Sequence, residues 1–193
     1  MGLGLDNLIG GIMDKSCSHE KAFHEAAHAV LAVRYGIEIV GDVLLGLPSE
    51  IDKYAKLIEG GCLTIRGGSP DQINLVLLAG WVAESYFKWL SLVNLYRMAG
   101  KTTALSLQSI IDKSRPKPET VDMQQYKYVC EDQLLTDVEK VVDIVKENWP
   151  WITTVAAKLC DLKTIKHDDV EMIVVLPSDE CIGYDFYAKC FQK

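Results

Sequence analysis

The chain has 193 residues, a formal net charge of −7 and a sequence pI near 5.1. This length suits one domain with a substantial core. Nucleic acids and anionic membrane surfaces attract basic proteins, so the acidic balance argues against both as partners.

Cysteine usage and the start of the chain favour a cytoplasmic protein. Six cysteines are scattered without a Cys-x-x-Cys pair, and no charged and then apolar leader opens the sequence. Reduced thiols are the expected state in that compartment. The most apolar run, 73–90, contains Glu84 and Lys88, which favours a core helix over a membrane span.

The motif His-Glu-x-x-His occupies residues 24–28, within a segment that is predicted to be helical over 18–35. Ser18 is a favourable N-cap, and Gly36 follows as a stop signal. Residues 1–17 are then an N-terminal extension. The small side chains around the motif predict a helix that packs closely and is buried.

This spacing brings two histidines to one face of the helix. Because four residues make about one turn, the rings of His24 and His28 can share a metal ion. Zn²⁺ suits two imidazoles and a carboxylate, with a fourth position left for water. Glu25 can accept the proton of that water. The motif is typical of zinc-dependent hydrolysis of peptide bonds.

A small β-sheet is predicted after the motif helix. Apolar and β-branched residues favour strands within 37–47, with Gly41 as a bend, and within 62–65. An edge strand can hold an extended peptide through main-chain hydrogen bonds. This makes Leu63, Thr64 and Ile65 candidate substrate-binding residues, and a purely structural hairpin is the alternative.

A second buried helix is predicted over 70–90. It follows a cap formed by Ser69, Pro70 and Gln72, and it is apolar on nearly every face. Glu84 stands out there, because a carboxylate in apolar surroundings needs a partner. A metal, an arginine or a helix end can supply one.

The rest of the chain is predicted to be helical. The fold class is therefore mainly α with a small β-sheet (α+β), in one domain over 18–176 that is followed by a tail over 177–193. The expected helices are one or two within 91–113 broken near Gly100, one from about Thr120, one over 136–148, one from Pro150 to about 160, and one over 168–174.

A two-histidine site needs a third protein ligand. Leu31 and Arg34 stand where the metzincin pattern requires glycine and histidine, so that class is excluded. Two carboxylates are left as candidates, Glu84 on the second helix and Asp122 further along the chain.

Five segments, in order, resemble the zinc peptidase domain of the FtsH proteases, over about residues 20–175. They are the histidine motif, Leu77-Leu78-Ala79-Gly80-Trp81-Val82-Ala83-Glu84, Val121-Asp122-Met123-Gln124, Ile144-Val145-Lys146-Glu147-Asn148-Trp149 and the stretch 159–174. The family usually has glycine where Ala27 stands, and its stretch between the positions of Glu84 and Asp122 is usually shorter.

The resemblance implies a role for each site residue. His24, His28 and Asp122 would bind Zn²⁺, and Glu25 would be the general base. Glu84 would lie near the site without binding the metal, although it is the alternative third ligand. The chain has no Gly-x-x-x-x-Gly-Lys-Ser/Thr loop, so neither ATP nor the family's ATPase module is expected.

The sequence therefore predicts a zinc metallopeptidase that cleaves peptides or flexible protein segments. The alternative is a non-catalytic (pseudo-peptidase) binding or scaffold protein that keeps the fold, with or without the zinc. The sequence does not decide whether the chain forms a homo-oligomer or binds a partner protein.

Overall fold

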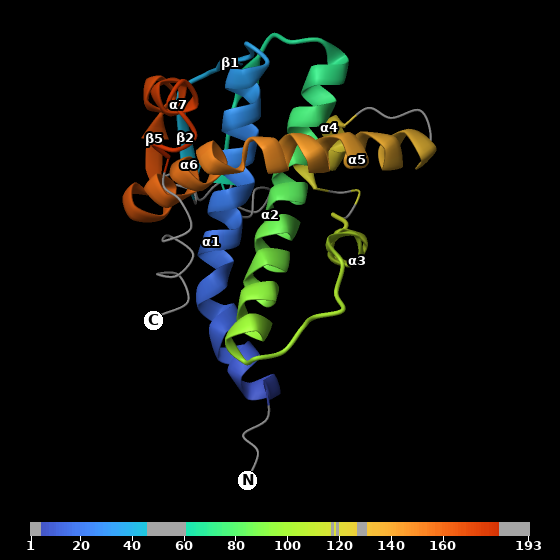
Figure 1. The fold of residues 1–193 in the computed structure, drawn as a ribbon. Coiled ribbons are helices and arrows are strands. Elements are labelled where there is room, and N and C mark those ends of the chain that lie inside the picture. The colour runs from blue at the N-terminus through green and yellow to red at the C-terminus, as the bar shows by residue number, and fades with distance from the viewer. Residues whose placement is uncertain (1–4, 46–60, 117, 119, 127–130, 182–193) are drawn as a thin grey trace, which may run out of the picture.

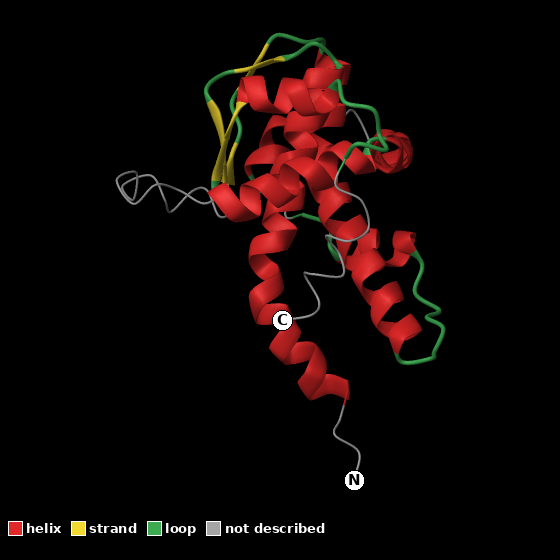
Figure 2. Ribbon diagram, turned by 60° about the vertical axis from the view of Figure 1, so that its left-hand side comes forward, coloured by secondary structure: helices red, strands yellow, loops and turns green. Residues whose placement is uncertain are grey.

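Two long antiparallel helices, α1 (Leu5–Arg34) and α2 (Pro70–Met98), form the centre of the fold (Figure 1). The structure is a computed structural model, and it describes residues 5–45, 61–116, 118, 120–126 and 131–181. Within these ranges the chain is mainly helical with two small antiparallel sheets (Figure 2). The predicted fold class is confirmed.

The motif helix α1 is buried through its middle, as predicted. Nearly all its side chains from Ala22 to Ala32 are buried, and they pack mainly against α2 and α6 (Trp149–Leu162). The predicted start at Ser18 is wrong, because the helix begins at Leu5. Apolar residues recur at 5, 8, 9, 12 and 13, a helical spacing that continues the helix past a residue favourable at a cap.

The second central helix, α2, begins with the predicted capping box. The Ser69 side chain accepts from the Gln72 backbone N–H, and the Gln72 side chain accepts from the Ser69 backbone N–H. The helix ends at Met98, beyond the predicted end near 90. By length and composition α2 alone among the described helices could cross a membrane, and 56% of its most apolar window is buried inside the fold. Core helices pass the same test, so the absence of a membrane span stays a prediction.

The strands form two sheets. In one, β1 (Glu38–Ile39) pairs with β4 (Ile65–Arg66), and in the other the order is β3 (Gly61–Cys62), β2 (Asp42–Leu45) and β5 (Thr164–Lys166). Gly41 has a φ of +84° and makes the predicted bend between β1 and β2. The single strand predicted over 62–65 is wrong, because the chain crosses there from one sheet to the other. The third strand of the second sheet, β5, was not predicted.

The remaining helices surround the central pair. α5 packs on α2, and α4 also contacts α2. The predicted break near Gly100 is confirmed, whereas the start predicted at 136 for α5 is five residues late. The helices are α3 (Leu107–Lys113), α4 (Val121–Gln125), α5 (Glu131–Glu147), α6 and α7 (His167–Val174).

An aromatic stack joins the helices beside the histidine motif. The Phe23 ring is stacked on Phe87 of α2 and on Trp149 of α6, with centroids 4.4 Å and 5.0 Å apart. Phe23 is fully buried. Because such contacts are worth about 0.5–1.5 kcal/mol beyond burial, they hold α1 in place one residue before His24.

Candidate metal centre

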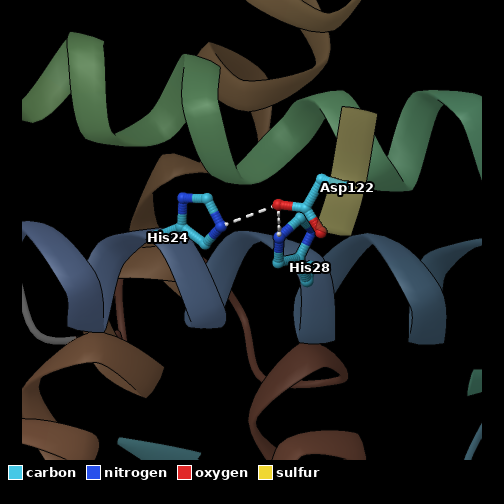
Figure 3. A group of neighbouring side chains, drawn as sticks. All are labelled: His24, His28 and Asp122. Atoms are coloured by element: carbon cyan, nitrogen blue, oxygen red, sulfur yellow. Dashed lines mark hydrogen bonds and ion pairs between the residues drawn. The ribbon is translucent and has the colours of Figure 1, made fainter. Parts of the chain in front are cut away.

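Three side chains from two distant segments converge between α1 and α4 (Figure 3). His24 and His28 project from the buried middle of α1, one turn apart, with ring centroids 4.7 Å apart. Asp122 lies in the first turn of α4, where the preceding Thr120 has the extended backbone of an N-cap. The predicted helix start near Thr120 therefore brings Asp122 to the histidines.

The spacing of the three ligand atoms suits a small metal ion. Oδ2 of Asp122 lies 3.1 Å from Nε2 of His24 and 3.5 Å from Nε2 of His28, and all three atoms lie within 4.8 Å of one another. Two ligands of a tetrahedral zinc ion are separated by about 3.3 Å, since each bond is about 2.0–2.2 Å long. Both histidine–aspartate distances are close to that value.

His28 presents a bare nitrogen to the site. Its Nδ1–H donates to the backbone carbonyl of Val76 in α2 over 2.7 Å, which fixes the tautomer. In the neutral ring Nε2 is then an acceptor, and it is fully buried without a hydrogen-bond partner in the described part of the chain. A lone pair that faces the Asp122 carboxylate needs a cation between them, so this orphaned atom fits a metal ligand.

A series of charged side chains in contact with one another meets His24 on the side away from Asp122. Its Nδ1 lies 3.5 Å from Oε2 of Glu84, and Oε1 of Glu84 accepts from Nζ of Lys88 over 2.6 Å. The same Nζ lies 3.2 Å from the Glu20 carboxylate on α1. A carboxylate on the outer nitrogen of a metal-binding histidine orients the ring and raises its basicity.

The metal-free cluster holds a proton where a metal would bind. Burial alone would lower the pKa of His24, but its hydrogen bonds to Asp122 and Glu84 outweigh burial and raise that pKa to about 10. Burial would likewise raise the pKa of Asp122, yet the adjacent His28 and His24 hold it well below the usual range. His24 is therefore protonated at neutral pH, with both ring nitrogens donating to carboxylates.

The pKa values of the two glutamates near the site are shifted in opposite directions. Glu25 is 7% exposed, and burial raises its pKa, although His28 and His24 oppose the shift. Burial would also raise the pKa of Glu84, but contacts with His24 and Lys88 outweigh it and lower that pKa to about 2. Glu25 is thus suited to exchange protons, whereas Glu84 stays a fixed negative charge.

The structure separates the two candidate third ligands. Asp122 belongs to the three-residue cluster, whereas Glu84 meets His24 at the outer nitrogen, Nδ1, and not at Nε2. The partner predicted for Glu84 was a metal, an arginine or a helix end, and it is instead a lysine together with a histidine. Lys88 was missed, although two charged residues one turn apart in an apolar helix were the available signal.

The candidate substrate strand lies at the junction of the two sheets. Leu63 and Thr64 connect β3 to β4, and Ile65 pairs with Ile39 of β1. The Thr64 carbonyl accepts from the Val40 N–H over 2.8 Å, so this acceptor is already used within the fold. A role of these residues in substrate binding stays a prediction.

Comparison of the chain with models of protein families, with curated proteins and with solved structures finds no match. The function must therefore be inferred from the geometry and chemistry of this site.

Proposed function

We propose that the protein is a zinc metallopeptidase whose metal is held by His24, His28 and Asp122. The observation that carries the proposal is the buried Nε2 of His28, which lacks a hydrogen-bond partner among the described residues and faces Asp122. Two imidazoles and one carboxylate are a ligand set that zinc prefers when one position stays open.

When bound, Zn²⁺ would polarise the carbonyl of a peptide bond and lower the pKa of the attacking water. Glu25 accepts the proton of this water and delivers it to the leaving amine. Burial prepares it for this role, because it keeps the pKa of the Glu25 carboxyl above its ordinary value although His28 and His24 oppose the shift.

The motif and the surrounding helix order also support a hydrolase. The glutamate of the His-Glu-x-x-His pattern has no role in binding the metal, so its presence beside the site favours catalysis over a purely structural zinc. The resemblance to the FtsH peptidase domain assigns the same roles to Glu25 and to the three ligands. Peptides and flexible protein segments are the proposed substrates, and the cytoplasm is the proposed compartment.

The test is cleavage of unstructured polypeptides by zinc-loaded protein, with Glu25→Gln as the matched variant. We expect the native chain to cut and Glu25→Gln to keep its zinc while losing activity by about 10²–10⁴-fold. Zinc binding without cleavage by either chain would instead favour a binding or scaffold protein. Equal cleavage by both chains would contradict the assigned mechanism.

A further inference from the structure

Gly80 lies in the middle of α2, directly opposite the two histidines. A Cβ atom added there would overlap Nε2 of His28, and it would lie 2.7 Å from Nε2 and 2.8 Å from Cδ2 of His24. These atoms belong to rings that are held in place at their outer nitrogens. A side chain at position 80 would therefore displace the rings, because real Cβ atoms do not approach other atoms so closely.

The backbone of Gly80 does not require glycine. It is regular helix, with no positive φ. Alanine is the better helix former at such a position, and Ala79 and Ala83 are buried in the same helix. Glycine at position 80 is thus explained by the close approach of the histidines and not by the helix itself.

One face of α2 meets the histidine face of α1 at steps of one turn. Lys88 contacts Glu20, Glu84 contacts His24, Gly80 faces both histidines, and the Val76 carbonyl accepts from His28. Three of these four positions orient or neutralise a group of the site through polar contacts. Position 80 alone contributes no side chain, and this lets Nε2 of both histidines lie close to the backbone of α2.

We infer that Gly80 is a positioning residue that lets both histidine rings lie where their Nε2 atoms can share a metal. The point where a Cβ would stand is slightly further from His24 Nε2 than the roughly 2.0–2.1 Å of a zinc–nitrogen bond. A metal shared by both histidines would therefore compete for space with a side chain at position 80. The inference rests on the proposed zinc site, and it adds a residue that is not a ligand and that determines whether the metal fits.

Two measurements on Gly80→Ala test this inference. The first is a zinc titration of metal-stripped native and variant chains, with helix content monitored by circular dichroism. The second is the midpoint of thermal unfolding in the presence of a chelator. It is measured for Gly80→Ala placed in the native chain and placed in the His24→Ala/His28→Ala chain, each compared with its parent. We expect a folded variant that takes up no zinc. The thermal midpoint should fall when Gly80→Ala is placed in the native chain, because the added Cβ collides with the rings. It should rise when Gly80→Ala is placed in His24→Ala/His28→Ala, because the rings are gone and only the higher helix propensity of alanine remains.

The outcomes are distinct from those that test the zinc site itself. A native chain that binds no zinc overturns both proposals, before any variant is compared. A native chain and a Gly80→Ala chain that bind zinc equally well overturn only the inference about Gly80. If Gly80→Ala does not fold, recovery of folding in the histidine-free background supports the inference, and failure to recover overturns it.

Discussion

Nδ1 of His24 on α1 lies 3.5 Å from Oε2 of Glu84 on α2, and the second oxygen of Glu84 accepts from Lys88. This contact holds the imidazole ring from the side away from Asp122. Because Glu84 touches the outer nitrogen only, it is placed to orient a ligand and not to be one.

Glu84→Gln should weaken zinc binding without abolishing it. The amide can still contact the ring, but it removes the negative charge that raises the basicity of His24. Loss of such an outer partner typically costs about 10–100-fold in metal affinity. Titration against a competing chelator measures the change, with Asp122→Asn as the comparison that should lose stoichiometric zinc. Equal losses in the two variants would make Glu84 a ligand, and no loss in Glu84→Gln would remove its orienting role.

Zinc affinity should rise with pH. The pKa of His24 in the metal-free protein is about 10, so a metal that binds its Nε2 below that pH must release a proton. The apparent affinity then increases by about tenfold per pH unit for one released proton. Calorimetry in buffers of different ionisation enthalpy counts the protons. An affinity that is constant between weakly acidic and weakly alkaline pH would contradict this picture of the metal-free site.

The metal-free protein should lose stability in acid. Contacts with His24 and Lys88 lower the pKa of Glu84 from 4.5 to about 2, so below pH 4.5 the unfolded chain binds the proton more readily. The stability from this group is present above pH 4.5 and is lost as the pH falls through about 2. Unfolding in chelator over this range should show Glu84→Gln less sensitive to acid by roughly 1–2 kcal/mol.

The matched control for the acid experiment is Asp143→Asn. That side chain is 78% exposed on α5, and its Oδ1 lies 3.5 Å from Nζ of Lys146. Exposed pairs of this kind contribute little to stability. A reduction in acid sensitivity for Asp143→Asn as large as for Glu84→Gln would show that the effect is general and does not arise at the site.

Tyr126→Phe should loosen the aspartate ligand. The Tyr126 hydroxyl donates to Oδ2 of Asp137 over 2.9 Å, and both side chains are buried. Tyr126 caps α4, since its N–H donates to the Asp122 carbonyl over 2.8 Å. Removing a hydrogen bond to a buried charge costs roughly 1.5–3 kcal/mol, and we also expect weaker zinc binding because α4 loses its link to α5.

Denaturant unfolding and a zinc titration together measure the effect of Tyr126→Phe. Tyr35→Phe, at the end of α1, is a control that removes a hydroxyl from a half-buried tyrosine. Stability lost without any change in zinc affinity would show that the bond to Asp137 holds the core and has no influence on Asp122.

The elements with strong local signals were predictable, and so was the cluster. The capping box at Ser69 and the helix start near Thr120 depend on neighbouring residues only, and both appear in the structure. The motif spacing placed His24 and His28 on one face. Asp122 came from the resemblance and not from local chemistry, because its closeness to α1 depends on how α4 packs.

Contacts between distant elements could not be predicted from the sequence. Ser18 has the chemistry of a cap, yet apolar residues at helical spacing before it extend α1 to Leu5. Strand β5 has three residues and exists because it pairs with β2, a partner more than a hundred positions away. The close approach of Gly80 to both histidines is likewise visible only once α1 and α2 are packed together.

The most direct test is the metal content of the native chain, purified without added zinc and measured by elemental analysis. We expect about one zinc ion per chain, lost in His24→Ala and Asp122→Ala and kept at reduced affinity in Glu84→Ala, as for a site with two histidines and one carboxylate. A folded native chain that carries no metal and takes up none when zinc is offered would rule out a zinc site at these residues.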